Sequence, residues 1–189
     1  MTGDLCLLAD VKDWLDLTVS TKDGQLTRLI TAASEDIRQE ASRVFDIENY
    51  DEIYSGAGWG HGILLTRHWP IVSITSLTID NQSIPAQLGA GQRGYTWTNN
   101  DAASHVMLWG YEFTRGTDNI ELLYRAGYAQ LPYDLTQACI DLVAYRFLGR
   151  QRIGQKSKSI VGEVVTFQTD HMPDNVLRVV QRYKKVIPI

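Results

Sequence analysis

The sequence predicts an α+β fold, a small bundle of about four helices that carries an inserted antiparallel β-rich subdomain. Helical periodicity is confined to the two ends of the chain, in segments near residues 10–15, 23–45, 131–149 and 174–183. The middle, about residues 50–128, is rich in β-branched and aromatic residues and is broken by glycine and Asn/Asp clusters. Because no Pro- or Ser-rich linker separates the two kinds of sequence, we expect a β insert on a helical scaffold.

The composition is that of an ordinary globular chain, with 44% hydrophobic and 21% charged residues among 189. The two cysteines, Cys6 and Cys139, are far apart and in no CxxC arrangement. They predict neither a disulfide framework nor a zinc knuckle, and they fit a reducing compartment. Since no apolar run approaches the ~18 residues of a membrane span and the N-terminus lacks a basic segment, we expect a protein made inside the cell, without membrane contact.

The first two helices are expected before the β-rich region. The segment 10–15 predicts a short helix with Asp10 as its N-cap. The segment 23–45 is the clearest helix, with Arg28, Glu35, Arg38 and Arg43 mostly away from its apolar face. Apolar residues recur there at spacings of three and four: Leu26, Ile30, Ala33, Ile37, Ala41 and Phe45.

Two further helices are expected after the β-rich region. One begins near Leu131–Asp134, where Pro132 suits a first turn, and ends near Gly149. Its expected buried residues are Leu135, Ala138, Cys139, Leu142 and Val143. The other follows Pro173 and Asp174, with Lys184 and Lys185 at its negative end. It places four residues on one side: Val176, Leu177, Val180 and Tyr183.

Within the middle region, β-branched and aromatic runs predict strands and polar clusters predict turns. The strand candidates are Ile63–Leu65, Ile71–Ile79, Val106–Phe113 and Asn119–Arg125. The turn candidates are Asp80–Asn81 and Arg115–Asp118.

The glycine-rich stretch Ser55–Gly62 does not match a phosphate-binding loop. Such a loop opens a helix and carries a Gly-Lys-Ser/Thr or Rossmann spacing. Here the following residues, Ile63–Leu65, predict a strand, and no lysine follows. A mobile loop between strands is the better interpretation.

No arrangement predicts a catalytic, metal or cofactor site. His61, His68, His105 and His171 are scattered, with no HExxH motif. Asp134 and Asp141 share a helix face, so they form either a carboxylate pair or ordinary exposed helix carboxylates. The tryptophans and tyrosines of the middle region are expected in the core or in subunit contacts.

Charge is distributed unevenly. Residues 1–60 hold 12 acidic and 5 basic residues, whereas the segment Leu142–Gly162 has no acidic residue. The basic residues of that segment are Arg146, Arg150, Arg152, Lys156 and Lys158. This pattern fits either a surface for an acidic protein or nucleic acid, or a solvated helix end and loop.

Several segments, read in order, carry a family resemblance. They are Asp10–Leu15, Leu29–Ile37, the glycine-rich stretch, Trp69–Asp80, Tyr124–Tyr128, Leu131–Leu135, Lys156–Val164 and the terminal helix after Pro173. Together they resemble the head–tail connector (adaptor, or head-completion) family of long-tailed phages and prophages. The resemblance covers nearly the whole chain and is weakest over about Pro85–His105.

The resemblance implies a structural virion protein without catalytic residues or cofactors. Its expected form is a ring of about twelve subunits beneath the portal protein, at the head–tail junction, assembled in the host cytoplasm. The ring would extend the DNA channel and dock the stopper or tail-completion protein. The whole chain, 1–189, would be one connector domain, with a helical core (about 8–48 and 131–150), the β insert (about 50–128) and a basic loop and docking arm (about 150–189).

The expected contacts lie in the docking arm. Contact with DNA in the channel or with an acidic partner is expected from Arg150, Arg152, Lys156 and Lys158, and DNA contact there would be transient and non-specific. Docking on the portal or another partner is expected from Val176, Leu177, Val180, Tyr183, Lys184, Lys185, Val186, Ile187 and Ile189. The alternative for the apolar tail Val186–Ile189 is a strand or plug that packs on its own domain.

Two other functions remain open. Another neck protein, such as a stopper or tail-completion subunit, is disfavoured because those proteins are more strongly β. A non-specific nucleic-acid-binding module is disfavoured by the acidic pI of about 5.5.

Overall fold

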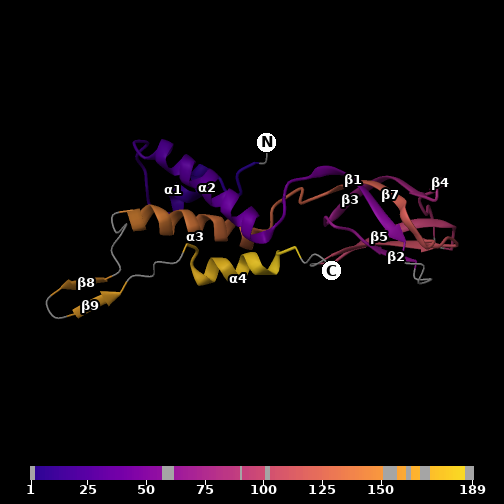
Figure 1. Ribbon diagram of the computed structural model, residues 1–189. Coiled ribbons are helices and arrows are strands. Elements are labelled where there is room, and N and C mark those ends of the chain that lie inside the picture. The colour runs from indigo at the N-terminus through magenta and orange to yellow at the C-terminus, as the bar shows by residue number, and fades with distance from the viewer. Residues whose placement is uncertain are drawn as a thin grey trace. The chain divides into compact units, whose positions relative to one another are not determined.

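The computed structural model describes residues 3–56, 62–89, 91–100, 103–150, 157–160, 163–166 and 171–185 (Figure 1). They divide into two compact units, with boundaries at Arg43/Val44 and Gln130/Leu131. The helical unit comes from the two ends of the chain and the β unit from the middle. Four helices and antiparallel sheets in these residues confirm the predicted α+β class.

In the helical unit, α2 packs against α3, α3 against α4, and α1 against both α2 and α3. A hairpin of two strands lies between α3 and α4 in the sequence. The elements are α1 (Leu8–Trp14), α2 (Asp23–Ala41), α3 (Tyr133–Gly149), β8 (Ser157–Ile160), β9 (Glu163–Thr166) and α4 (Asp174–Arg182). None of the described helices is long and apolar enough to cross a membrane.

Helix α2 buries the predicted stripe from Leu26 to Ala41 but ends before Phe45, where the sequence placed its end. Ser42 follows the helix with a left-handed φ of 53°, and its N–H donates to the Gln39 carbonyl at 3.1 Å. Phe45 is therefore buried outside the helix.

The prediction that Arg38 and Arg43 lie away from the interior is wrong. The Arg38 guanidinium is buried and donates to the Gly3 carbonyl. The Arg43 guanidinium, also buried, donates to the Tyr183 carbonyl at 3.5 Å. Both arginines bind backbone oxygens at the edges of the unit, a contact that helical periodicity does not reveal.

The other helices are close to their predicted positions, with corrected ends. Leu7 occupies the N-cap of α1, so Asp10 is a first-turn residue and not the cap. Pro132 precedes α3 as its N-cap, and Tyr183 follows α4 as its C-cap. All five residues expected to be buried in α3 are buried.

The β unit contains two antiparallel sheets, of strand order β1-β7-β3-β4 and β2-β6-β5. The strands are β1 (Glu48–Gly56), β2 (Ile63–Leu65), β3 (Ile71–Ile79), β4 (Gln82–Ile84), β5 (Gly94–Asn99), β6 (Ser104–Trp109) and β7 (Gly116–Ala126). Strands β2 and β3 have the predicted bounds. Strand β6 ends before Phe113, and β7 begins at Gly116, within the stretch predicted as a turn.

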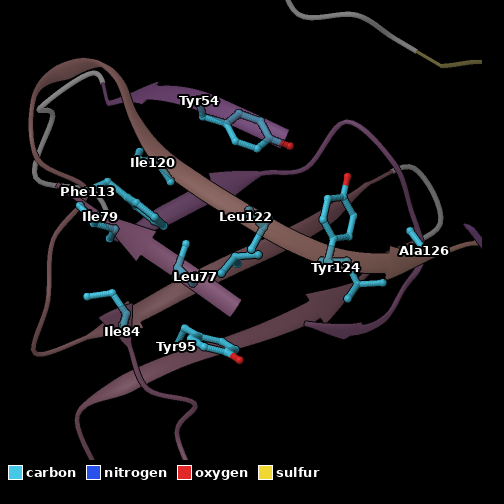
Figure 2. Close-up of a cluster of buried hydrophobic side chains, with 12 residues drawn as sticks. Tyr54, Leu77, Ile79, Ile84, Tyr95, Phe113, Ile120, Leu122, Tyr124 and Ala126 are labelled. Carbon is cyan, nitrogen blue, oxygen red and sulfur yellow. The ribbon is translucent and has the colours of Figure 1, made fainter. Parts of the chain in front are cut away.

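Both sheets contribute side chains to one buried apolar cluster (Figure 2). Leu77 and Leu122 come from the centre of the four-stranded sheet, while Tyr95 and Val106 come from the three-stranded sheet. The turn at Asp80–Asn81 is confirmed, because both residues adopt positive φ between the paired strands β3 and β4.

Candidate interaction surfaces

Helix α4 is anchored to the helical unit by its apolar side. Val176 and Val180 are fully buried, and Leu177 is half-buried. These residues, which the sequence predicts to dock on a partner, lie on the helix that packs against α2 and α3. A partner therefore reaches Val176 and Val180 only if α4 separates from its own unit.

Asp134 and Asp141 hold the two ends of α4. Asp134 accepts a hydrogen bond of 2.6 Å from the Tyr183 hydroxyl at the C-terminal end of the helix. Asp141 accepts one of 3.2 Å from the Asn175 amide in its first turn. The two carboxylates thus share a face of α3, as the sequence indicated, but each binds a partner on α4 and they form no pair.

The chain after α4 is fastened to the end of α2. The Lys184 Nζ lies 3.0 Å from Glu40 Oε1, and the Lys185 backbone N–H donates to the Ala41 carbonyl at 2.9 Å. Val186, Ile187 and Ile189 lie outside the described residues. The accessible side of this segment is polar and carries three cations: Asp174, Asn175, Arg178, Gln181, Arg182 and Lys184 are exposed.

The basic segment after α3 is partly a hairpin, where the sequence predicted a loop. Strands β8 and β9 pair in register, with Lys158 opposite Val165. Arg150 follows α3 as its C-cap, and its guanidinium lies 3.9 Å from the centre of the Phe147 ring and donates to the Phe147 carbonyl. Arg152, Lys156 and the side chain of Lys158 lie outside the described residues.

The outer face of the three-stranded sheet is largely apolar on β2 and β6, whereas β5 places Thr96 and Thr98 there. Leu64 and Val106 point toward the core, so the residues that alternate with them point outward. Ile63 and Leu65 are 55% and 50% exposed, and Trp109 is 59% exposed. Since Ile63 pairs with Met107 and Leu65 with His105, these five side chains form one surface, named here the outer β2–β6 face.

The outer face of the four-stranded sheet is mixed, because Leu123 lies on it beside the charged residues and Val72 of β3 is 42% exposed. On β1 and β7, Glu52 and Leu122 face the core. Their exposed neighbours include Asp51, Glu121 and Arg125, together with the apolar Ile53 at 52% exposure. An exposed apolar surface such as the outer β2–β6 face is typical of a protein–protein contact.

A buried carboxylate ties together the interior of the β unit. Glu52 Oε1 lies 2.8 Å from His68 Nδ1, while its Oε2 accepts hydrogen bonds from the Tyr54 and Tyr124 hydroxyls. The two hydroxyls also accept the backbone N–H groups of Arg67 and His68, at 3.2 and 3.1 Å. This network fixes the segment before β3 to strands β1 and β7.

The network also sets the protonation of its members. Burial favours the neutral acid at Glu52, but hydrogen bonds from His68, Tyr54 and Tyr124 outweigh it and lower the pKa of this carboxyl. Burial and the neighbouring carboxylate raise the pKa of Tyr54. Burial, Tyr54 and Glu52 together raise the pKa of Tyr124. Glu52 is thus a charged structural group held by neutral phenols.

The described residues contain no cluster of three or more His, Cys, Asp or Glu that could hold a metal ion. His68 binds Glu52 in the β unit, whereas His171 lies 3.5 Å from Asp36 in the helical unit. His105 lies on the outer β2–β6 face.

A family model described as "Head completion protein" matches residues 4–186. The chain belongs to the head completion protein family. This confirms the resemblance that the sequence motifs indicated. No curated protein sequence matches the chain.

Solved structures with the same fold come from gene transfer agent (GTA) particles. A chain in the neck of the empty GTA particle, computed with C6 symmetry, aligns with a TM-score of 0.57 and 18% identity over 100% of this chain and 94% of that one. A chain in the neck of the native particle, computed with C12 symmetry, aligns with a TM-score of 0.54 and 17% identity over 100% of this chain and 97% of that one. A chain in the virion of the native particle aligns with a TM-score of 0.55 and 18% identity over 96% of this chain and 90% of that one.

Sequence reasoning missed two surfaces of this head completion protein. The outer β2–β6 face was hidden because strand alternation does not say which side meets the core. On α4, the sequence analysis chose the apolar side for docking on a partner and did not include the exposed cations Arg178 and Arg182. The hairpin β8–β9 had a usable signal in the β-branched residues on both sides of Gly162.

Proposed function

We propose that this head completion protein is a structural subunit of the virion neck that forms a ring of about twelve copies beneath the portal. The ring extends the DNA channel, docks the stopper or tail-completion protein and has no catalytic role. The observation that carries the proposal is the end-to-end alignment with chains of particle necks, two of them computed with C6 and C12 symmetry. Family membership over residues 4–186 supports it. Assembly would take place in the host cytoplasm.

Within the proposed ring, the outer β2–β6 face packs against a different surface of the next copy. Closed rings require such head-to-tail contacts between unlike surfaces. The half-exposed Ile63, Leu65 and Trp109 provide the apolar area that a copy-to-copy contact needs. The mixed outer face of the four-stranded sheet stays in water.

The docking arm, residues 150–189, is proposed to meet the portal as part of a single connector domain. Because Val176 and Val180 are buried, the contact uses the outward Arg178, Arg182 and Lys184, together with the tail residues Val186, Ile187 and Ile189. Such a cationic surface suits an acidic portal protein. Arg150, Arg152, Lys156 and Lys158 are proposed to contact either that protein or passing DNA, in the second case weakly and without sequence preference.

The ring contact is tested by sedimentation of the full-length protein, alone and with purified portal protein. Changing Leu65 and Trp109 to Ser is expected to abolish ring assembly on the portal. Ile53→Ser is the matched control, since Ile53 is equally exposed on the other sheet and lies outside the proposed contact. Equal loss of assembly in both variants would assign the effect to general destabilisation and contradict the proposed surface.

The docking role is tested separately. Charge reversal of Arg178 to Glu is expected to weaken co-sedimentation with portal while leaving the fold intact, whereas Arg182 is left unchanged because its guanidinium lies 3.5 Å from Asp134. An intact protein that never associates with portal, in virions that are fully tailed without it, would overturn the connector function. Salt-dependent duplex binding that falls when Arg150, Arg152, Lys156 and Lys158 become Ala, with no portal binding, would indicate a nucleic-acid-binding module instead.

A further inference from the structure

The helical unit buries a pair of thiols that are 133 positions apart in the sequence. Cys6 Sγ lies 3.4 Å from Cys139 Sγ, and the side chains are 4% and 0% exposed. Neither residue is in a disulfide. Since a disulfide bond has a length of about 2.05 Å, a relative shift of roughly 1.3 Å joins the two sulfur atoms.

The two cysteines differ in how firmly they are held. Cys139 lies in the middle of α3, whereas Cys6 belongs to the non-helical segment that leads into α1. That segment is fastened by the Leu5 N–H, which donates to Ser34 Oγ at 2.9 Å, and by the Gly3 carbonyl, which accepts from Arg38. Cys6 is therefore on the less regular backbone of the two, and a reagent reaches the two buried thiols only if this short segment opens locally.

The surroundings make the two sulfur atoms unequal. Cys6 donates its S–H to Cys139 Sγ. Ser34 Oγ lies 3.6 Å from the same sulfur and, having accepted the Leu5 N–H, has its own hydrogen to donate. These donors lower the pKa of Cys139 against the opposing effect of burial, while the contact with Cys139 raises the pKa of Cys6.

We propose that Cys6 and Cys139 form a reversible thiol–disulfide site that is oxidised by small disulfides such as oxidised glutathione. The thiolate of one of the two cysteines attacks one sulfur of the small disulfide, breaks its S–S bond and releases one small thiol. The other cysteine then gives up its proton and attacks the first protein sulfur, which releases the second small thiol. The two protein thiols lose two electrons and two protons in total, and the small disulfide gains them.

The product is a disulfide that ties the N-terminal segment to α3. In the reducing host cell the site stays as two thiols, and in an oxidising medium outside the cell it closes. That change of compartment rests on the proposed function, a component of released particles, but the chemistry of the site does not. The disulfide strengthens the helical unit after assembly.

The test uses the full-length protein, reduced, freed of reductant and treated with millimolar oxidised glutathione. Thiols are then trapped with a maleimide in denaturant and analysed by intact mass, peptide mapping and non-reducing gels. The expected product is a monomer that has lost two hydrogen atoms, carries no maleimide, and melts roughly 5–15 °C higher until dithiothreitol is added. Two maleimides per chain, a lasting glutathione adduct, or only intermolecular dimers would overturn the proposal.

Cys6→Ser and Cys139→Ser are the matched controls, since each keeps one thiol of the pair. Both are expected to stop at the reduced form or the glutathione adduct and to show no rise in melting temperature. A rise of the same size in either variant would contradict the assignment. The wild-type measurement decides the question even if a variant fails to fold, and assembly on the portal, assayed in reducing buffer, reports on the proposed function separately.

Discussion

The helical unit and the β unit both place polar groups at their packing surfaces, but in different ways. The helical unit buries an apolar stripe and keeps its carboxylates, Asp134 and Asp141, at the partly exposed margin of the α3–α4 contact. The β unit buries a carboxylate, Glu52, among side chains that donate hydrogen bonds to it. When a hydrogen-bond partner is removed at a partly exposed contact, water takes its place. When one is removed in a protein interior, a buried polar group is left without a hydrogen bond. Among these three carboxylates, the one in the β unit is therefore the most sensitive to loss of its partners and to acid.

The largest expected effect is that of removing the buried carboxylate. Glu52→Ala leaves two buried phenols and His68 without their shared acceptor, which costs about 3–5 kcal/mol of unfolding free energy. Glu121→Ala, on the exposed side of the neighbouring strand, is the control and should change stability by less than about 0.5 kcal/mol. Urea unfolding followed by tryptophan fluorescence measures the unfolding free energy of both variants. Equal losses in the two variants would contradict the special role of the buried carboxylate.

An intermediate effect is expected from pH. Because the folded-state pKa of Glu52 is lowered from its ordinary value of 4.5, its stabilisation is fully present above that value. It is lost as the pH falls from about 4.5 through the folded-state pKa. Glu52→Gln lacks this titration, so the difference in urea midpoint between wild type and variant should shrink on acidification. A difference that is constant from pH 7 to pH 3 would show that Glu52 does not titrate in this way.

The smallest effect is expected at the margin of the helical unit. Tyr183→Phe removes the 2.6 Å hydrogen bond to Asp134 and should lower the unfolding free energy by only about 0.5–1.5 kcal/mol, since water reaches the carboxylate. Gln181→Ala, on the outward side of α4, is the control and should be neutral within about 0.5 kcal/mol. If Tyr183→Phe lowers the unfolding free energy as much as Glu52→Ala does, the difference between the two units is contradicted.

The fold was predictable where a local pattern specifies it. Helix α3 has its predicted buried residues, and β3 has its predicted bounds, because the apolar period in each matches the geometry of the element. Strand β1 was missed because one of its inward residues is Glu52, next to the inward Tyr54. A carboxylate is normally assigned to the surface, so the sequence showed no apolar alternation there. The end of α2 was misplaced because Ser42 adopts a left-handed conformation that this residue type seldom signals.

The sequence by itself determined the α+β class, the order of the main elements and the family, since these follow from periodicities and motifs that are local in the chain. Only the tertiary structure decided which surfaces are available. It turned Val176 and Val180 inward and left Ile63, Leu65 and Trp109 exposed. It also brought Cys6 to Cys139 and Glu52 to His68. Such contacts depend on strand register and on packing between distant segments, and a local pattern contains no information about either.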